Sequence, residues 1–243
     1  MIDHYDWAGG REAMLRFGPA DGPVVVVAMP LLEEWNRTRA FVVSILRLLA
    51  QRGIASALPD LPGQGESTAA TVDARLGLWR GAFASAVASI ARAGVSPGTL
   101  SIRGGALIEQ TALAHNRWRL SPSTGLEVGD EFARLLSMAE NARHPEYSQL
   151  RKAGMASLVP INLGPRDIAG NLVHADLIDE IYSDDPVGCE PPVRVVRLET
   201  DGRPADRKVA GRPLWRASEP DVDPLLAATL ADDIAAWLST CAA

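Results

Sequence analysis

The chain has little of several features that would assign it to a class of protein. It has two cysteines, Cys189 and Cys241, which are too few and too far apart for a disulfide framework, so we expect a reducing, cytoplasmic location. No hydrophobic run approaches the ~20 residues of a membrane-spanning helix, and the polar, acidic N-terminus does not predict a signal peptide. Basic residues form no stripe with interleaved aromatics, which argues against a nucleic-acid partner.

Signals for metal or cofactor chemistry are also missing. No cluster of His, Cys, Asp and Glu has the spacing of a metal site, and Cys189 has no such residue nearby. We therefore expect no metal, no cofactor and no membrane span. The remaining composition is that of a globular protein, with 47% hydrophobic residues, 22% charged residues and a net charge of −6. A length of 243 residues predicts one domain with an insertion.

Buried strands alternate with amphipathic helices along the chain. The continuous run of β-branched residues at 24–29 is typical of a strand buried on both faces of a parallel sheet. The order predicts a doubly wound, mostly parallel α/β sheet in a single domain spanning 1–243, with a lid inserted at 126–190. Expected strands cover 14–17, 24–29, 54–58, 99–102, 117–121, 192–199 and, more weakly, 213–217. One expected helix follows residues 30–39 and ends at Gly53. The other expected helices cover 72–92, 126–142, a segment that begins at His174 or Ala175 and ends at 181, and 226–238.

Residues 99–108 are the most informative stretch. A short apolar strand runs into a small-residue turn and then an apolar helix, which is the form of the nucleophile elbow of α/β-hydrolases. The elbow motif reads G-x-S-x-G, and residues 101–105 read Ser-Ile-Arg-Gly-Gly. Residues 60–67, Asp-Leu-Pro-Gly-Gln-Gly-Glu-Ser, resemble the D-x-x-G-x-G-x-S loop of the same fold. The fold class is therefore expected to be of the α/β-hydrolase type with a helical lid.

The elbow places Arg103 where the nucleophile should stand. A guanidinium stays protonated in proteins and cannot attack an acyl carbon as serine or cysteine does. Ser101 belongs to the strand, so its side chain is expected to point away from the apex of the turn. Asp201 stands where the acid of a Ser-His-Asp triad is expected, in the loop after the strand that follows the lid.

The triad histidine is missing as well. It is expected between the last strand and the closing helix, and residues 214–223 contain none. The four histidines lie at the N-terminus, at the end of the elbow helix and in the lid: His4, His115, His144 and His174. Two of the three triad members are therefore absent from their expected places.

Polar groups nevertheless gather at the expected ligand end of the sheet, where parallel strands finish. Arg103 should not be buried without a carboxylate, and Glu33, Glu34 and Asp201 are the candidate partners. We take Arg103, Glu33, Glu34 and Asp201 as candidate catalytic residues. The candidate ligand-binding residues are Leu31, Leu32, Asn36, Arg37, Gly104, Ser123 and Trp215.

Three interpretations of Arg103 stay open from the residues alone. It could form an internal ion pair that fills a former active site. It could be a fixed cation that grips the carboxylate or phosphate of a ligand bidentately, helped by N–H groups of the following helix. It could also take part in unorthodox acid–base catalysis.

Four stretches together resemble the second type of exosortase A system-associated hydrolase, a family of α/β-hydrolases. They cover 29–39 (Met-Pro-Leu-Leu-Glu-Glu-Trp-Asn-Arg-Thr-Arg), 103–107 with the arginine elbow, 119–125 and 211–216. The resemblance spans 24–238 and departs from the family at Trp35, Ser101 and 162–165. It implies a role at exopolysaccharide and protein-sorting loci of Gram-negative bacteria. The family name reflects the fold and supplies neither the missing serine nor the missing histidine.

The preferred functional hypothesis is a pseudoenzyme. It would bind a small anionic, acyl or glycan-type ligand at the Arg103 cleft, in an exopolysaccharide- or exosortase-related pathway. The alternative is an active esterase- or thioesterase-like hydrolase in which Glu33 or Glu34 activates water. A third possibility is a non-catalytic scaffold or interaction protein whose cleft is filled.

Overall fold

Alternate residues of strand β3 (Val24–Ala28) belong to the hydrophobic cores on opposite faces of one sheet. Val24 and Val26 pack with one core, and Val25 and Val27 pack with the other. The computed structural model describes residues 1–91, 96–143, 149, 152, 164–184 and 192–241. Within them, the prediction that this strand is buried on both faces is confirmed.

The sheet has eight strands in the order β1-β2-β4-β3-β5-β6-β9-β10. Strands β4, β3, β5, β6, β9 and β10 pair in parallel, whereas β1 and β2 are antiparallel to their neighbours. The other strand bounds are β1 (Ile2–Trp7), β2 (Gly10–Phe17), β4 (Ala55–Pro59), β5 (Gly98–Ile102), β6 (Arg117–Leu120), β9 (Val193–Leu198) and β10 (Arg207–Val209). The mostly parallel, doubly wound fold class is thus confirmed.

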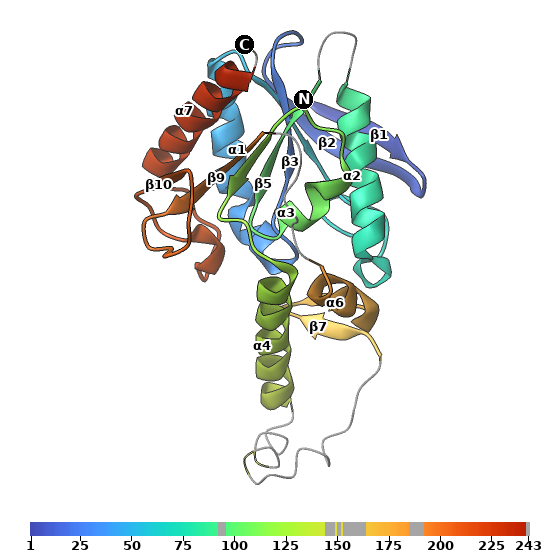
Figure 1. The fold of residues 1–243 in the computed structure, drawn as a ribbon. Helices are drawn as coiled ribbons and strands as arrows, with labels where there is room; N and C mark the ends of the chain where they lie inside the picture. Colours follow the sequence, from blue (N-terminus) through green and yellow to red (C-terminus); the bar gives the residue numbers. More distant parts are fainter. Residues whose placement is uncertain (92–95, 144–148, 150–151, 153–163, 185–191, 242–243) are drawn as a thin grey trace.

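Helices cover both faces of this sheet (Figure 1). Helices α1 (Glu33–Gln51) and α7 (Pro224–Cys241) pack on one face, and α2 (Leu76–Ile90) and the short α3 (Gly105–Ile108) pack on the other. Three short 3-10 helices complete the main body: η1 (Thr71–Asp73), η2 (Glu109–Thr111) and η4 (Leu214–Arg216). No helix in the described part of the chain is long and apolar enough to cross a membrane.

The described part of the expected lid extends from the end of the molecule opposite both termini (Figure 1). It contains helix α4 (Gly125–Arg143), a hairpin of β7 (Arg166–Ile168) and β8 (Asn171–Val173), and helix α6 (Ala175–Tyr182), all between β6 and β9 in the chain. The helices expected near 126–142 and from His174 are confirmed, and the hairpin was not expected. His144 and Cys189 lie outside the described residues.

Two local features fix the starts of helices α4 and α6. Thr124 and Glu127 form a reciprocal cap on α4, with the Glu127 N–H donating to Thr124 Oγ1 and the Thr124 N–H donating to Glu127 Oε2. The Asp176 N–H donates to His174 Nδ1 at the start of α6. His174 is therefore engaged in capping a helix.

The strand expected at 213–217 is wrong. Leu214 and Trp215 are buried as the pattern required, but they lie in the 3-10 helix η4, because the Arg216 N–H and the Ala217 N–H turn back to the carbonyls of Pro213 and Leu214. The last strand is instead β10. The antiparallel edge strand β1 was also missed.

Candidate functional site

The elbow is present in its full strand–turn–helix form. Strand β5 ends at Ile102, Arg103 has a φ of 53°, and α3 begins at Gly105. A positive φ in a residue other than glycine costs on the order of 1–3 kcal/mol and is typical of functional turns. A Cβ on Gly105 would lie 2.2 Å from the carbonyl oxygen of Ala28, so glycine allows α3 to approach β3 this closely.

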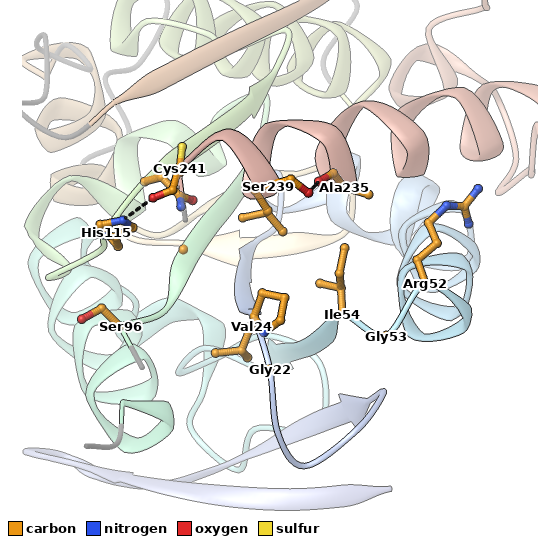
Figure 2. Close-up of a pocket in the computed structure, with 14 residues that line it drawn as sticks. Gly22, Val24, Arg52, Gly53, Ile54, Ser96, His115, Ala235, Ser239 and Cys241 are labelled. Atoms are coloured by element: carbon orange, nitrogen blue, oxygen red, sulfur yellow. Dashed lines mark hydrogen bonds between the residues drawn. The ribbon is translucent and has the colours of Figure 1, made fainter. Parts of the chain in front are cut away.

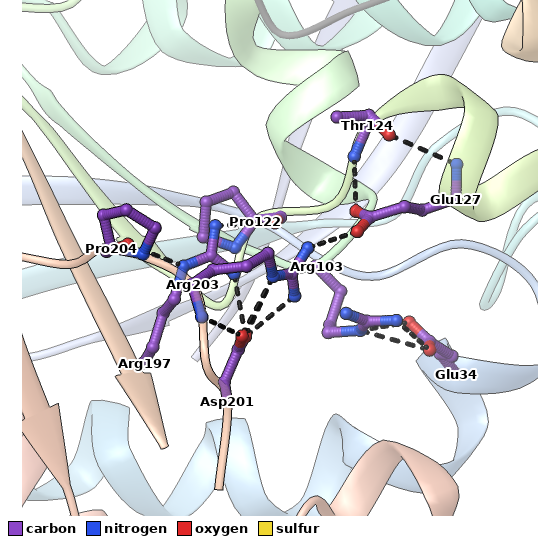
Figure 3. A network of polar contacts seen from close by, with 9 residues as sticks. All are labelled: Glu34, Arg103, Pro122, Thr124, Glu127, Arg197, Asp201, Arg203 and Pro204. Atoms are coloured by element: carbon purple, nitrogen blue, oxygen red, sulfur yellow. Dashed lines mark hydrogen bonds and ion pairs between the residues drawn. The ribbon is translucent and has the colours of Figure 1, made fainter. Parts of the chain in front are cut away.

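Arg103 pairs with Glu34 from the first turn of α1. Its Nη2 and Nε donate to Glu34 Oε1 at 3.2 and 3.3 Å, and Nε also lies 3.4 Å from Oε2 (Figure 3). The side chains are 14% and 20% exposed. Burial raises the pKa of Glu34, and the positive charge of Arg103 partly offsets that effect. Of the three candidate carboxylates, Glu34 is thus the one that neutralises the apex of the elbow.

Trp215 covers the other side of the same guanidinium. Arg103 Cζ lies 5.2 Å from the centroid of the indole ring, within the range of a cation–π contact. Arg37 supports this arrangement, because its Nη1 donates to the Trp215 carbonyl at 3.2 Å and its Nε donates to Glu33 Oε1 at 3.0 Å. Trp215 comes from the loop in which the triad histidine was expected. That loop therefore contributes an aromatic ring, whereas in a working hydrolase it contributes the histidine that acts as the base.

Asp201 occupies the expected acid loop but belongs to a separate network (Figure 3). Its carboxylate accepts from Arg197 Nη1 at 2.9 Å and from Arg203 Nε and Nη2 at 2.9 and 2.8 Å. These hydrogen bonds, those from Arg203 above all, hold the pKa of Asp201 well below its usual range. Arg203 also pairs with Glu127 of α4. Among the described residues, Asp201 forms no ion pair with Arg103.

Ser101 lies inside β5 and is 1% exposed. Its hydroxyl donates to Glu109 Oε1 at 3.0 Å, and the same oxygen accepts from Arg119 Nε at 2.7 Å. Glu109 is fully buried and also lies 3.8 Å from Arg117 Nη1. The prediction that Ser101 does not stand at the apex of the elbow is confirmed.

A narrow recess lies beside Arg103, between the elbow and α4. Its volume is about 20 Å³, close to the space of one water molecule. Its apolar walls are Leu31, Gly104, Val128, Phe132 and Leu135, and its charged walls are Glu33, Glu34, Arg37, Arg103 and Glu131. The elbow is therefore covered closely by α4.

A wider hollow of about 540 Å³ adjoins this recess. The two share the lining residues Arg37, Glu131 and Leu135, so they are adjacent, and we call the narrow inner recess and the wide outer hollow together the cleft. Its other lining residues are Arg134, Met138 and Arg216. Three guanidinium groups from α1, α4 and η4 therefore surround an outer hollow that can hold a small molecule.

The fold agrees with that of solved structures of known proteins. A loop variant of the haloalkane dehalogenase DbeA-M1 from Bradyrhizobium elkanii superposes with a TM-score of 0.58 and 12% identity, over 99% of this chain and 97% of its own. The alpha/beta hydrolase GrgF from Penicillium sp. sh18 gives 0.55 and 14%, over 83% and 81%. Est1E from Butyrivibrio proteoclasticus with bound ferulic acid gives 0.51 and 14%, over 80% and 77%. The chain has the α/β-hydrolase fold. No protein-family model and no curated protein matches it.

The α/β-hydrolase fold brings some of the expected ligand-binding residues to the cleft. Leu31, Arg37 and Gly104 line the recess. The other four do not line it: Leu32 is buried just before α1, Asn36 is exposed, Ser123 is buried with its N–H donating to the Arg103 carbonyl at 3.3 Å, and Trp215 lies behind Arg103.

Several lining residues were not expected from the sequence. Glu131, Phe132 and Leu135 come from α4, for which the sequence predicted a helix but no part in the site. Arg216 follows the expected residue Trp215 in the chain. The sequence placed both residues in a strand, and that wrong prediction did not show that the Arg216 side chain lines the cleft. Among the described residues, no group of three or more His, Cys, Asp or Glu side chains could hold a metal ion.

A second hollow, of about 650 Å³, lies at the opposite end of the sheet (Figure 2). It is formed by the amino-terminal ends of strands, such as Val24 and Gly98, and by the end of α7. Within it, His115 Nε2 lies 3.0 Å from the carbonyl oxygen of Cys241. Ligands of open α/β sheets bind at the carboxyl ends of the strands, so the elbow cleft is the better candidate site.

Proposed function

We propose that this protein binds a small anionic ligand, of acyl or glycan type, in the cleft between the elbow and α4, without Ser-His chemistry. One observation carries the proposal: the apex of the elbow is Arg103, held by Glu34 and backed by Trp215. The positions of nucleophile and base are thus filled by an ion pair and an aromatic ring. A rigid, charged floor of this kind suits recognition.

The sizes of the two parts of the cleft support a particular placement of the ligand. The inner recess of about 20 Å³ admits no more than a small group, whereas the outer hollow of about 540 Å³ can hold most of a small molecule. The ligand's anionic part would therefore lie in the outer hollow, where arginine side chains line the wall. The Arg103–Glu34 pair would form the inner boundary.

The proposed pathway rests on the resemblance of the elbow and of 29–39 to exosortase A system-associated hydrolases. A role in exopolysaccharide or protein sorting follows from that resemblance, and the proposed cytoplasmic location follows from the two widely spaced cysteines. Sorting or polysaccharide genes beside the gene for this protein would support it. Mass spectrometry of small molecules retained by the protein after mild purification would identify the ligand directly.

A thermal-shift screen with phosphates, carboxylates and sugars tests the binding proposal. We expect anionic compounds to raise the melting temperature of the wild-type protein, and we expect Arg103→Ala to reduce that shift. Arg37→Gln serves as a second variant in case Arg103→Ala does not fold, because Arg37 lines both parts of the cleft. If both folded variants keep the wild-type shifts, the binding proposal is wrong.

A second candidate function is hydrolysis with Glu34 as a general base. The raised pKa of Glu34 and a recess that fits one water favour it. In this reaction the Glu34 carboxylate would take a proton as water attacks the acyl carbon of an ester or thioester; the acyl C–O or C–S bond then breaks, and Glu34 returns the proton to the leaving alcohol or thiol, which leaves a carboxylic acid as the other product.

Short acyl esters and thioesters provide the test of this second candidate. Turnover that is abolished by Glu34→Gln but kept by Ser101→Ala would replace the binding proposal with the hydrolase. The absence of both turnover and ligand-induced shifts would favour the scaffold.

A further inference from the structure

Arg216 differs from the other arginines of the cleft in its partners. Arg37 pairs with Glu33, Arg103 with Glu34 and Arg134 with Glu131. The side chain of Arg216 is exposed at the end of η4 and forms no hydrogen bond or ion pair with any residue in the described part of the chain, although its charge acts at longer range on Glu34 and Glu131. Its five N–H donors are therefore available to a ligand.

Charge on the lining of the outer hollow is strongly unequal. Arg37, Arg134 and Arg216 contribute three positive charges, whereas Glu131 contributes one negative charge. Counting the inner recess as well adds Arg103 with Glu33 and Glu34, so the whole cleft keeps an excess of one positive charge. This excess would attract an anion into the hollow, where Arg216 is the lining arginine whose guanidinium has no direct ion pair in the described part of the chain.

The arrangement of the three arginines favours one class of anion. They come from three separate elements, α1, α4 and η4, and line the same hollow. A planar carboxylate presents two oxygens in one plane, which a single guanidinium fork can satisfy. A phosphoryl group presents three strong acceptor oxygens in a tetrahedral arrangement and can accept from donors on several sides.

An apolar wall completes the hollow. Leu135 and Met138 of α4 line it beside the arginines, and Met138 is 60% exposed. The carbon skeleton of a ligand could pack there while its anionic group faces the guanidinium groups. The volume of about 540 Å³ leaves room for both parts.

We infer that the outer hollow is a phosphoryl subsite, in which Arg216 selects a phosphorylated small molecule over a carboxylate of the same skeleton. This inference rests on the proposed binding function and names its ligand class. Arg37 and Arg134 flank the phosphoryl group, and Leu135 and Met138 contact the carbon skeleton.

Phenyl phosphate and benzoate are matched probes, because they carry the two anionic groups on the same ring. Isothermal titration at constant ionic strength should show tighter binding of phenyl phosphate to the wild-type protein. Arg216→Gln removes charge-assisted hydrogen bonds, so we expect its Kd for phenyl phosphate to rise about tenfold or more. Its Kd for benzoate should change much less.

Arg212→Gln is the matched control. Arg212 precedes η4, is 62% exposed, pairs with Asp221 and does not line the hollow. It should bind phenyl phosphate as the wild type does. Arg216→Gln should fold normally, because the Arg216 side chain is exposed and forms no hydrogen bond or ion pair within the described structure.

Different results separate this inference from the proposed function. If phenyl phosphate binds no more tightly than benzoate, or if Arg216→Gln leaves its Kd unchanged, the phosphoryl subsite is wrong. The binding function then still stands if other anions shift the melting temperature and Arg103→Ala reduces that shift. If no anion binds the wild-type protein, both proposals fail.

Discussion

The indole ring of Trp215 covers the guanidinium of Arg103, with 5.2 Å between Arg103 Cζ and the ring centroid. Glu34 binds the same guanidinium through its Nη2 and Nε atoms. The cation is thus held by a carboxylate and by the negative face of an aromatic ring. A strained backbone and three side chains from distant parts of the chain are combined to fix one charge.

Replacing Trp215 should destabilise the protein, and the loss should be smaller when the new side chain keeps an aromatic ring beside Arg103. Trp215 is 7% exposed and packs in the core that α1 and α7 share. We expect Trp215→Ala to lower the free energy of unfolding by about 3–5 kcal/mol. Trp215→Phe should cost clearly less, because its ring keeps the cation–π contact. Urea denaturation measures both, and equal losses would show that the aromatic face contributes nothing specific.

Removing the positive charge of the elbow should leave Glu34 as an uncompensated carboxylate. We expect Arg103→Met to lower the free energy of unfolding by about 3 kcal/mol at pH 7. The double variant Arg103→Met/Glu34→Gln should lose less than Arg103→Met alone, since it leaves no unpaired charge. If the double variant is less stable than Arg103→Met alone, the stabilising ion pair between Arg103 and Glu34 is contradicted.

The same variant should show a characteristic pH dependence. Burial raises the pKa of Glu34, and losing Arg103 removes an interaction that opposes this rise. The folded state then binds the Glu34 proton more tightly than the unfolded chain does, so stability is gained as the pH falls from 7 toward the unfolded pKa of about 4.3. Arg103→Met should therefore approach wild-type stability at pH 5 in urea titrations. Adding Glu34→Gln should abolish this recovery.

Asp233 of α7 should stabilise the fold above acidic pH. Its carboxylate is 2% exposed and accepts from Arg194, Arg207 and Trp118 at 2.7–2.8 Å. Burial would raise its pKa, but these hydrogen bonds outweigh burial and lower the pKa to about 2. The stabilisation is therefore present above the unfolded pKa of about 3.9 and is lost as the pH falls toward 2.

Asp233→Asn tests this assignment. We expect it to lose about 2 kcal/mol of stability at pH 7 and to show a flatter decline between about pH 4 and pH 2 than the wild type. Urea denaturation at a series of pH values measures the decline. An unchanged slope in the variant would assign the acid sensitivity to other carboxylates.

Two glycines should respond oppositely to alanine. A Cβ on Gly105 would lie 2.2 Å from the Ala28 carbonyl oxygen and 2.7 Å from that of Met29, so Gly105→Ala must displace α3 from β3. A Cβ on Gly81, exposed in α2, meets nothing within 4 Å, so Gly81→Ala should stabilise by about 0.5–1 kcal/mol. Thermal unfolding compares them, and a fully stable Gly105→Ala would refute the close approach.

The elements with strong apolar periodicity were predictable from the sequence. The valines of β3, the apolar residues of α4 and the small residues after β5 form patterns that depend on the local chain alone. The type and order of these elements could therefore be predicted without knowing tertiary contacts. β10 was not predictable, because Arg207 and Lys208 are exposed in a strand of three residues. At Leu214 and Trp215 a strand was predicted where none exists. Both residues are buried, and burial alone does not distinguish a strand from a 3-10 helix.

The sequence predicted which charged residues gather at the site better than it predicted which of them form ion pairs. Sequence order brought Glu33, Glu34, Asp201 and Arg103 to one end of the sheet, but it could not say which carboxylate reaches Arg103. That choice depends on Arg37 occupying Glu33 and on Arg197 and Arg203 occupying Asp201. Each of these is a tertiary or helical contact that competes for one carboxylate.

Arg203 contacts both Asp201, which follows β9, and Glu127, in the first turn of α4. Glu127 also caps α4 through Thr124, so this end of the helix is fastened to the loop of Asp201. The residue in the acid position of the fold, which would orient a histidine in a working hydrolase, here fastens the amino-terminal end of the helix that covers the cleft.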